Sequence, residues 1–273
     1  MYILSTKHSF NVPIDAENII PDTFADNSVN DIKKLKIWEG NREKVLGDLF
    51  IIKREKDNRN SNTSIKILGN LTKVKRIGAE MTYGEIIIEG DVGMRLGEEM
   101  RDGTITVNGN AGSWVGTMMK GGNIEITGNA GDYVGSAYRG STAGMAGGKI
   151  IIHGNAGNEV GCFMVDGLIK IHGNVELFLG MHMSGGTIFV EGNSEGRMGA
   201  QMTRGKIVVE GKVPSVLPSF IVDAIRENVK VDKDRVKGPF YLFKGDITES
   251  WKGSLYISTA KNPHLSFYQS KIV

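Results

Sequence analysis

Glycine recurs at a fixed interval of 19 residues along this 273-residue chain. The leading glycine of each unit forms the series Gly90, Gly109, Gly128, Gly154, Gly173, Gly192 and Gly211, and its one longer step equals one period plus seven residues. We assign those seven residues to an insertion, STAGMAG (141–147). A second glycine follows in the first six units, at Gly97, Gly116, Gly135, Gly161, Gly180 and Gly199. A period near 20 residues is typical of solenoid proteins, whose units bury their apolar faces against one another.

The stretch IEITGNAGDYVG (124–135) also resembles a phosphate-binding loop, because a β-rich run leads into a glycine-rich turn. A dinucleotide loop occurs once and opens a helix, whereas this motif recurs along the chain. The spacing leaves no room for an ordinary helix of about 11 residues beside two strands. The repetition therefore favours a structural role for the glycines.

Apolar residues alternate with polar ones before each leading glycine. The β-branched residues four and two positions before it are Ile86/Ile88, Ile105/Val107, Ile124/Ile126, Ile150/Ile152, Ile169/Ile171, Ile188/Val190 and Ile207/Val209. We expect them to form the buried face of a short strand. A second short strand is expected to end at Leu96, Val115, Val134, Val160, Leu179 and Met198, and a row of large residues follows at Met100, Met119, Tyr138, Met164, Met183 and Met202.

These strands predict an all-β fold, a parallel β-helix of seven to eight coils stacked about 4.8 Å apart. The paired glycines are predicted to be turn residues, because glycine permits positive φ and close backbone approach. Each leading glycine is followed by a polar residue: Asn70, Asp91, Asn110, Asn129, Asn155, Asn174 or Asn193. We interpret this row as a hydrogen-bonded turn ladder rather than a polar binding groove.

The segments outside the regular spacing are predicted to close the stack. Residues 1–64 are expected to form an N-terminal cap, with a degenerate first coil at Gly40, Gly47 and Phe50. Residues 65–211 carry the coils, and residues 212–273 form a C-terminal cap or arm. Within it, YLFKGDITESWKGSLYIS (241–258) predicts two strands around a turn.

Charge and composition exclude several classes of protein. The net charge is +2, no apolar run approaches the roughly 20 residues of a membrane span, and the N-terminal MYILSTKHSFNVPID lacks the pattern of a signal peptide. The one cysteine, Cys162, excludes an intrachain disulfide and by itself cannot hold an iron–sulfur cluster. We expect a cytoplasmic protein without nucleic-acid or membrane partners.

Three sets of residues are candidates for chemistry. His153 and His172, followed by Glu191 and Glu210, occupy one column and could ligate zinc. Glu176 and Glu195 could act as paired carboxylates, and Cys162 as a nucleophile. A mixed outward-facing row, a solvated corner and a packing position explain the three sets better. We therefore expect no catalytic, cofactor-binding or metal-binding residue.

Apolar residues on the outer strand face mark a candidate subunit interface. Alternation points Ile87, Ile151, Phe189 and Val208 away from the core. Such a surface is expected to be covered, either by another subunit or by this chain's own tail, since PSFIVDAIRENV (218–229) has helical spacing.

Two resemblances follow from these motifs. The repeated G-N-A-G-x-x-V-G units resemble the GXGXG domain at the C-terminus of the glutamate synthase large subunit. NVPIDAENIIPDTF (11–24) and KIWEGNREKVLGDLF (36–50) are similar to the C subunit of formylmethanofuran dehydrogenase, over most of residues 1–211.

The second resemblance implies a right-handed β-helix that acts as a scaffold in a cytoplasmic multisubunit oxidoreductase of methanogenic archaea. That complex reduces carbon dioxide with ferredoxin electrons and fixes it on methanofuran as a formyl group, the first step of methanogenesis in this one-carbon metabolism. The resemblance assigns the tungsten- or molybdenum-pterin, the iron–sulfur clusters and a dinuclear metal site to other subunits. The alternatives are a formyltransferase/hydrolase scaffold, a stand-alone glutamate synthase domain and a carbohydrate-active β-helix enzyme.

Overall fold

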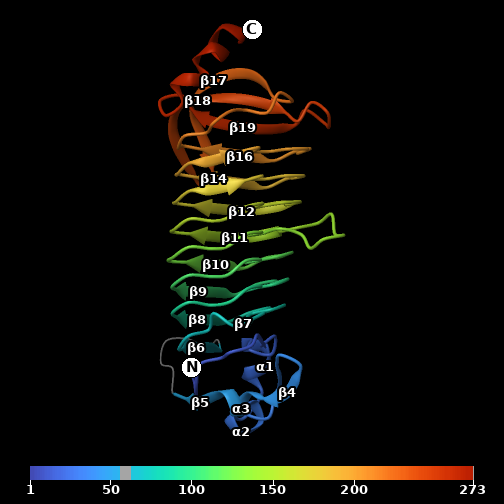
Figure 1. Ribbon diagram of the computed structural model, residues 1–273, viewed down its shortest axis with the longest axis vertical. Helices are drawn as coiled ribbons and strands as arrows, with labels where there is room; N and C mark the ends of the chain where they lie inside the picture. The colour runs from blue at the N-terminus through green and yellow to red at the C-terminus, as the bar shows by residue number, and fades with distance from the viewer. Residues whose placement is uncertain (56–62, 273) are drawn as a thin grey trace.

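One large sheet runs the length of the molecule. The computed structural model describes residues 1–55 and 63–272. Thirteen strands are hydrogen-bonded in the order β17-β18-β19-β16-β14-β12-β11-β10-β9-β8-β6-β1-β5, and Figure 1 shows them stacked along the long axis. Their bounds are β1 (Tyr2–Thr6), β5 (Phe50–Arg54), β6 (Ser64–Leu68), β8 (Glu85–Glu89), β9 (Thr104–Asn108), β10 (Asn123–Ile126), β11 (Ala146–Ile152), β12 (Asp166–Ile171), β14 (Thr187–Val190), β16 (Lys206–Val209), β17 (Ile221–Val231), β18 (Asp234–Gly245) and β19 (Gly253–Ser258).

The 19-residue spacing sets the register of the central strands. From β6 to β16, neighbouring strands are parallel, so that Ile86 pairs with Ile105 and Ile105 with Ile124. The side chains four and two positions before each leading glycine are buried, with Ile105, Ile126 and Ile207 fully inaccessible. The predicted inward face is therefore confirmed. Burying one such side chain is worth about 1.5–3 kcal/mol, so the continuous column is the main source of cohesion between strands.

The fold class needs correction, because the predicted all-β, right-handed parallel β-helix is not the architecture found. The main sheet is mixed, with antiparallel pairs β1–β5, β17–β18 and β18–β19 at its ends. Residues 1–55 and 63–272 also contain three short α-helices and a 3₁₀ helix. In the described residues, the second strand of each unit is reduced to one short pair, β13 (Val175–Leu177) with β15 (Ser194–Gly196), and a few isolated bridges.

The missing second strand has a physical cause in the backbone. Leu96, at the predicted end of such a strand, lies in a turn between Arg95 and Gly97, whose φ angles are 63° and 64°. A strand requires φ near −120°, so a left-handed residue on either side of the apolar position prevents a regular ladder. The apolar side chain is nevertheless buried, since Leu96 is inaccessible to solvent.

The N-terminal residues lie at one end of the main sheet, and their apolar side chains join the same core (Figure 1). They contain α1 (Pro21–Ala25), α2 (Val29–Ile32) and α3 (Leu46–Leu49), and a four-stranded sheet in the order β4-β3-β2-β7. These strands are β2 (Ile14–Asp15), β3 (Lys36–Glu39), β4 (Arg42–Val45) and β7 (Val74–Lys75). The predicted degenerate coil is wrong, because Gly40 turns the antiparallel β3–β4 pair and Gly47 lies in α3.

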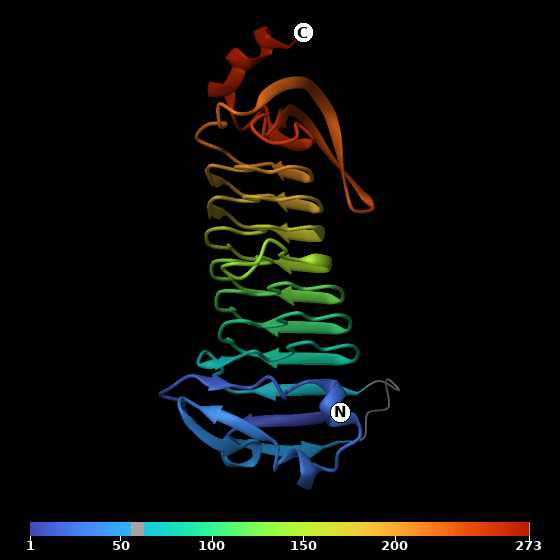
Figure 2. The same ribbon diagram turned by 90° about the vertical axis from the view of Figure 1, so that its right-hand side faces the viewer.

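The C-terminal residues form an antiparallel hairpin and a short final helix. The predicted pair of strands in residues 241–258 is confirmed, since β18 and β19 are antiparallel, and β19 continues the stack beside β16. The predicted helical spacing in residues 218–229 is wrong, because this segment lies mainly in β17. Figure 2 shows the β17–β18 hairpin curving down along one side of the stack, below the terminal η1 helix (Pro263–Lys271).

The hairpin packs on the outer face of the main sheet. Leu168, Phe189 and Val208 project from β12, β14 and β16 and are buried. They form one apolar cluster with Val229 and Val231 of β17 and with Phe240 of β18. The chain's own C-terminal segment therefore covers Phe189 and Val208, as a strand pair in place of the expected helix.

The insertion is placed differently from the sequence assignment. Met145 is inaccessible to solvent, and its terminal methyl group lies beside Gly167, as that of Met119 lies beside Gly148. Met145 thus takes the place assigned to Tyr138 in the buried methionine row. The seven extra residues are 138–144 rather than 141–147, and they project from the side of the stack (yellow-green loop, Figure 1).

Replacing Phe189 and Val208 together by Ser should loosen the hairpin while the stack stays folded. Each large side chain contributes about 1.5–3 kcal/mol by burial under the hairpin. Amide hydrogen exchange of β17 should accelerate at least tenfold, with β9 and β10 unchanged. Ile87→Ser, in the same outer column on β8, is the matched control. Equal protection of β17 in all variants would contradict this packing.

Candidate functional site

Two columns of left-handed residues run along the stack beside the second glycines. Residues two positions before that glycine have φ between 56° and 69°: Arg76, Arg95, Trp114, Tyr133, Glu159, Phe178 and Arg197. Residues two positions after it have φ between 52° and 59°: Glu80, Glu99, Met118, Phe163, His182 and Gln201. A left-handed backbone costs a non-glycine residue about 1–2 kcal/mol, so large side chains here are noteworthy.

Parallel stacking places equivalent side chains of these columns on one another. The Trp114 and Tyr133 rings stack with centroids 4.2 Å apart, and the Phe163 and His182 rings stack at 4.4 Å. Further along the first column, the Arg197 guanidinium lies over the Phe178 ring at 5.3 Å. Sequence reasoning missed these columns, although aromatic and charged residues at fixed offsets from glycine were a visible signal.

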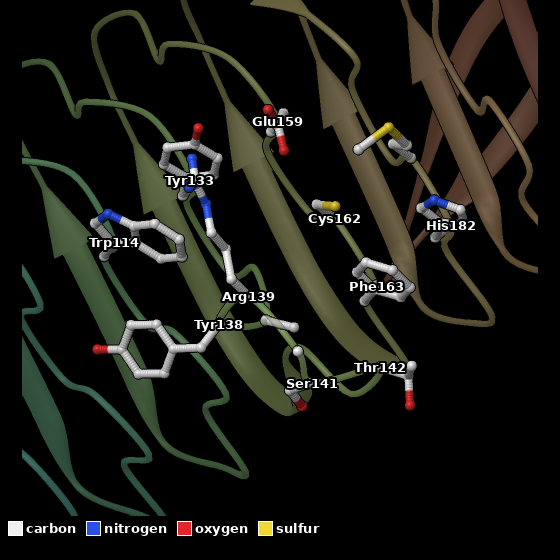
Figure 3. A pocket seen from close by; sticks show the side chains of 13 residues that line it. Trp114, Tyr133, Tyr138, Arg139, Ser141, Thr142, Glu159, Cys162, Phe163 and His182 are labelled. Carbon is white, nitrogen blue, oxygen red and sulfur yellow. The ribbon is translucent and has the colours of Figure 1, made fainter.

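A pocket lies between the two columns, where the insertion leaves the stack. Its volume is about 300 Å³. Figure 3 shows the side chains that line it, among them Trp114, Tyr133, Tyr138, Arg139, Glu159, Cys162, Phe163 and His182. The hollow exists because the small residue Ala137 stands where other units carry a large left-handed residue, and because residues 138–144 then turn outward.

Tyr138 closes one wall of this pocket. Its ring packs against Trp114 at 5.2 Å, and the Arg95 guanidinium lies over it at 4.8 Å. Burial raises the pKa of Tyr138, and the neighbouring Glu98 carboxylate adds to the rise. The phenol therefore stays protonated at neutral pH and serves packing rather than proton transfer.

Cys162 lies at the base of the same pocket and is 5% exposed. Burial, with a contribution from the Glu159 charge, raises the pKa of its thiol to about 12. A nucleophile needs the thiolate, and here that form is disfavoured. The environment fits the expected packing position and opposes a nucleophilic role.

The column of His153, His172, Glu191 and Glu210 forms separate pairs. His153 Nε2 lies 2.7 Å from Glu125 Oε1, and His172 Nδ1 lies 2.8 Å from Glu191 Oε2. The two imidazole rings stack face to face with centroids 4.9 Å apart. Their nitrogens therefore engage carboxylates on opposite sides and do not converge. Among residues 1–55 and 63–272, no cluster of three or more His, Cys, Asp or Glu side chains has a geometry for a metal ion.

The electrostatics of this column are those of a surface network. Burial opposes ionisation of Glu191. The hydrogen bonds with His172 and Lys170 outweigh this effect, so that the pKa of Glu191 is lowered. Burial and the charge of Glu191 raise the pKa of Glu210. Glu176 and Glu195 lie elsewhere, beside the asparagine row in a shallow hollow of about 380 Å³.

The predicted asparagine ladder is present. The side-chain oxygen of Asn110 accepts the backbone N–H of Asn129 at 2.8 Å, and Asn129, Asn155 and Asn174 repeat the contact with the next unit. Leading glycines allow close approach, since a Cβ on Gly192 would lie 2.3 Å from the Gly173 carbonyl oxygen. The second glycines of the six regular units have φ between 61° and 68°, a left-handed turn.

The four candidate interface residues fall into two groups. Phe189 is 4% exposed and Val208 is inaccessible, both beneath the β17–β18 hairpin. Ile87 and Ile151 lie in the same outer column, beyond the hairpin, and are half-buried.

Cys162 should react slowly with an aromatic disulfide reagent at pH 8 in the folded protein and rapidly after unfolding. Its folded-state pKa of about 12 lies above the ordinary 9.0. The stability gained by burying the neutral thiol is therefore complete below about pH 9 and is lost as the pH rises toward 12. Rapid labelling of the folded chain at pH 8 would show that the thiol is accessible and ionised. Cys162→Ala is the control for reagent consumed elsewhere.

Comparison with known proteins gives a consistent result, although no family model matches the chain. The chain is 44% identical over 92 residues to the C subunit of tungsten-containing formylmethanofuran dehydrogenase 2 of Methanothermobacter marburgensis. It is 43% identical over 94 residues to the C subunit of molybdenum-containing formylmethanofuran dehydrogenase 1 of Methanothermobacter thermautotrophicus. The first match covers 34% of each chain, and the second covers 34% of this chain and 23% of the relative.

A solved structure matches almost the whole chain. It belongs to the formyltransferase/hydrolase complex of Methylorubrum extorquens, solved in complex with methylofuran. The TM-score is 0.82 and the identity 31%, with 94% of this chain and 99% of the other covered. In the described part of the chain, no helix has both the length and the apolar composition to cross a bilayer. The chain belongs to the family of the formylmethanofuran dehydrogenase C subunit.

Proposed function

We propose that this chain is a non-catalytic scaffold subunit of a cytoplasmic formylmethanofuran dehydrogenase complex. Such a complex reduces carbon dioxide with ferredoxin electrons and fixes it on methanofuran as a formyl group. The observation that supports this most is a near-complete match to one chain of a solved multi-chain complex, together with relatives named as the C subunit of the dehydrogenase. In this proposal the tungsten- or molybdenum-pterin, the iron–sulfur clusters and the dinuclear metal site lie on other subunits.

The geometry suits a rigid support. Parallel strands in strict register and the asparagine ladder give a straight stack whose outer face is flat (Figure 2). The apolar contacts of the hairpin lie over β12, β14 and β16, and its turn reaches β11 through an ion pair between Asp232 and Lys149. Ile87 of β8 and Ile151 of β11 stay half-buried on the uncovered part, and we propose that they contact another subunit.

A second candidate is the scaffold of a formyltransferase/hydrolase complex. The observation in its favour is that the structural match to such a complex covers 94% of this chain, whereas the dehydrogenase relatives match 34% of it. The two proposals share the scaffold and differ in the partners. A redox metal–pterin subunit is needed only for the dehydrogenase.

Purification of the natively tagged chain, with mass spectrometry of co-purifying chains and elemental analysis, tests the proposal. The dehydrogenase assignment predicts partner chains with iron and either tungsten or molybdenum. Partner chains with formyl-transfer activity and neither metal would favour the second candidate. A chain that purifies alone with its own catalytic activity would contradict both.

The same purification tests the proposed contact surface. Ile87→Ser with Ile151→Ser should weaken recovery of partner chains while this chain stays folded. Thr106→Ser, on a strand between them in the same outer column, is the matched control.

A further inference from the structure

The pocket beside the insertion has the composition of an aromatic cage for a cation. Trp114, Tyr133 and Tyr138 form one wall and Phe163 the other (Figure 3). Trp114, Tyr133 and Phe163 are neither buried nor fully exposed. Trp114 and Tyr133 cover one face of each other and His182 covers one face of Phe163, which leaves the second faces of Tyr133 and Phe163 as the surfaces for a ligand. The negative face of an aromatic ring attracts cations, and cages of this kind recognise alkylammonium and guanidinium groups.

A carboxylate in the pocket supplies the complementary charge. Glu159 lines the cage between the two walls, and its charge raises the pKa of Cys162 at the base. Within the part of the chain that the structure describes, no cation lies within ion-pair distance of Glu159. Arg139 is exposed and lines the same pocket (Figure 3), and among the described residues it forms neither an ion pair nor a ring contact.

Contacts elsewhere along the columns of left-handed residues show which cation fits. Arg95 lies over the Tyr138 ring at 4.8 Å, and Arg197 lies over the Phe178 ring at 5.3 Å. Both arginines are members of the first column of left-handed residues. In the pocket, the residue that follows Tyr133 in the first column is Glu159, so Tyr133 has no guanidinium from that position, whereas Tyr138 is already covered by Arg95.

We propose that this cage binds a basic side chain, an arginine by preference, of a partner subunit. A planar guanidinium can stack on an aromatic face and pair with a carboxylate at the same time, whereas an ammonium group combines the two contacts less well. Tyr133, Glu159 and Phe163 all have the left-handed backbone that recurs at their positions in the other units, so the pocket is built on the regular part of the stack. The inference rests on the proposed function in one respect, that this chain works inside a complex.

The test uses the complex captured through the tagged chain. Glu159→Gln removes the charge and Phe163→Ala removes one wall, and each should weaken partner binding about tenfold. Glu176→Gln is the matched control, since this carboxylate lies in the separate hollow beside the asparagine row. Photo-crosslinking from a benzoylphenylalanine at position 163 should then identify a partner segment that contains Arg or Lys.

The possible outcomes distinguish failure of the cage proposal from failure of the scaffold function. If wild-type chain captures partners and both variants bind them as tightly as Glu176→Gln, the cage is not a docking site. A crosslink to a segment without a basic residue also overturns the proposal. A wild-type chain that captures no partner would instead refute the scaffold function, independently of the cage.

Discussion

The register of parallel pairing along the central strands is the constraint on which the rest of the structure depends. Because equivalent residues are 19 positions apart, neighbouring strands place β-branched residues over one another in the buried column. A slip of one residue would expose the whole inner column and bury its polar partners. The asparagine ladder and the close glycine contacts fix that register at the turn, since both need one unit to lie directly over the next.

Interruption of the register creates the features that look functional. Residues 138–144 are accommodated without disturbing the core, because Met145 fills the buried place that Tyr138 leaves. Tyr138 then becomes a wall, and Ala137 leaves a hollow between aromatic columns. At the far end, the hairpin covers Phe189 and Val208, while Ile87 and Ile151 stay open. Both surfaces that we propose for partners therefore lie where the 19-residue pattern is interrupted or where the hairpin leaves the outer face uncovered.

The features that follow from regular alternation and spacing were predictable from the sequence. The inward faces, the asparagine ladder and the β18–β19 pair follow from alternation and period, and the family follows from motifs in residues 11–50. The fold class was wrong, because alternation around Leu96 resembles a strand while Arg95 and Gly97 adopt left-handed backbones. Residues 218–229 form most of β17 and not the expected helix, because apolar spacing alone does not distinguish a strand from a helix that covers the same sheet. The seven inserted residues can be placed at 141–147, with Tyr138 in the buried row, or at 138–144, with Met145 in that row. The sequence allows both, and the burial of Met145 selects the second.

The most direct measurement of the register is the thermal stability of Ile126→Asp against Thr106→Asp. The two positions lie on neighbouring strands, with Ile126 in the buried column and Thr106 in the outer one. A carboxylate in the apolar column costs several kcal/mol, whereas one on the outer face stays hydrated. We expect loss of the β-type circular dichroism for Ile126→Asp at temperatures where Thr106→Asp stays folded. Equal melting temperatures for the two variants would contradict it.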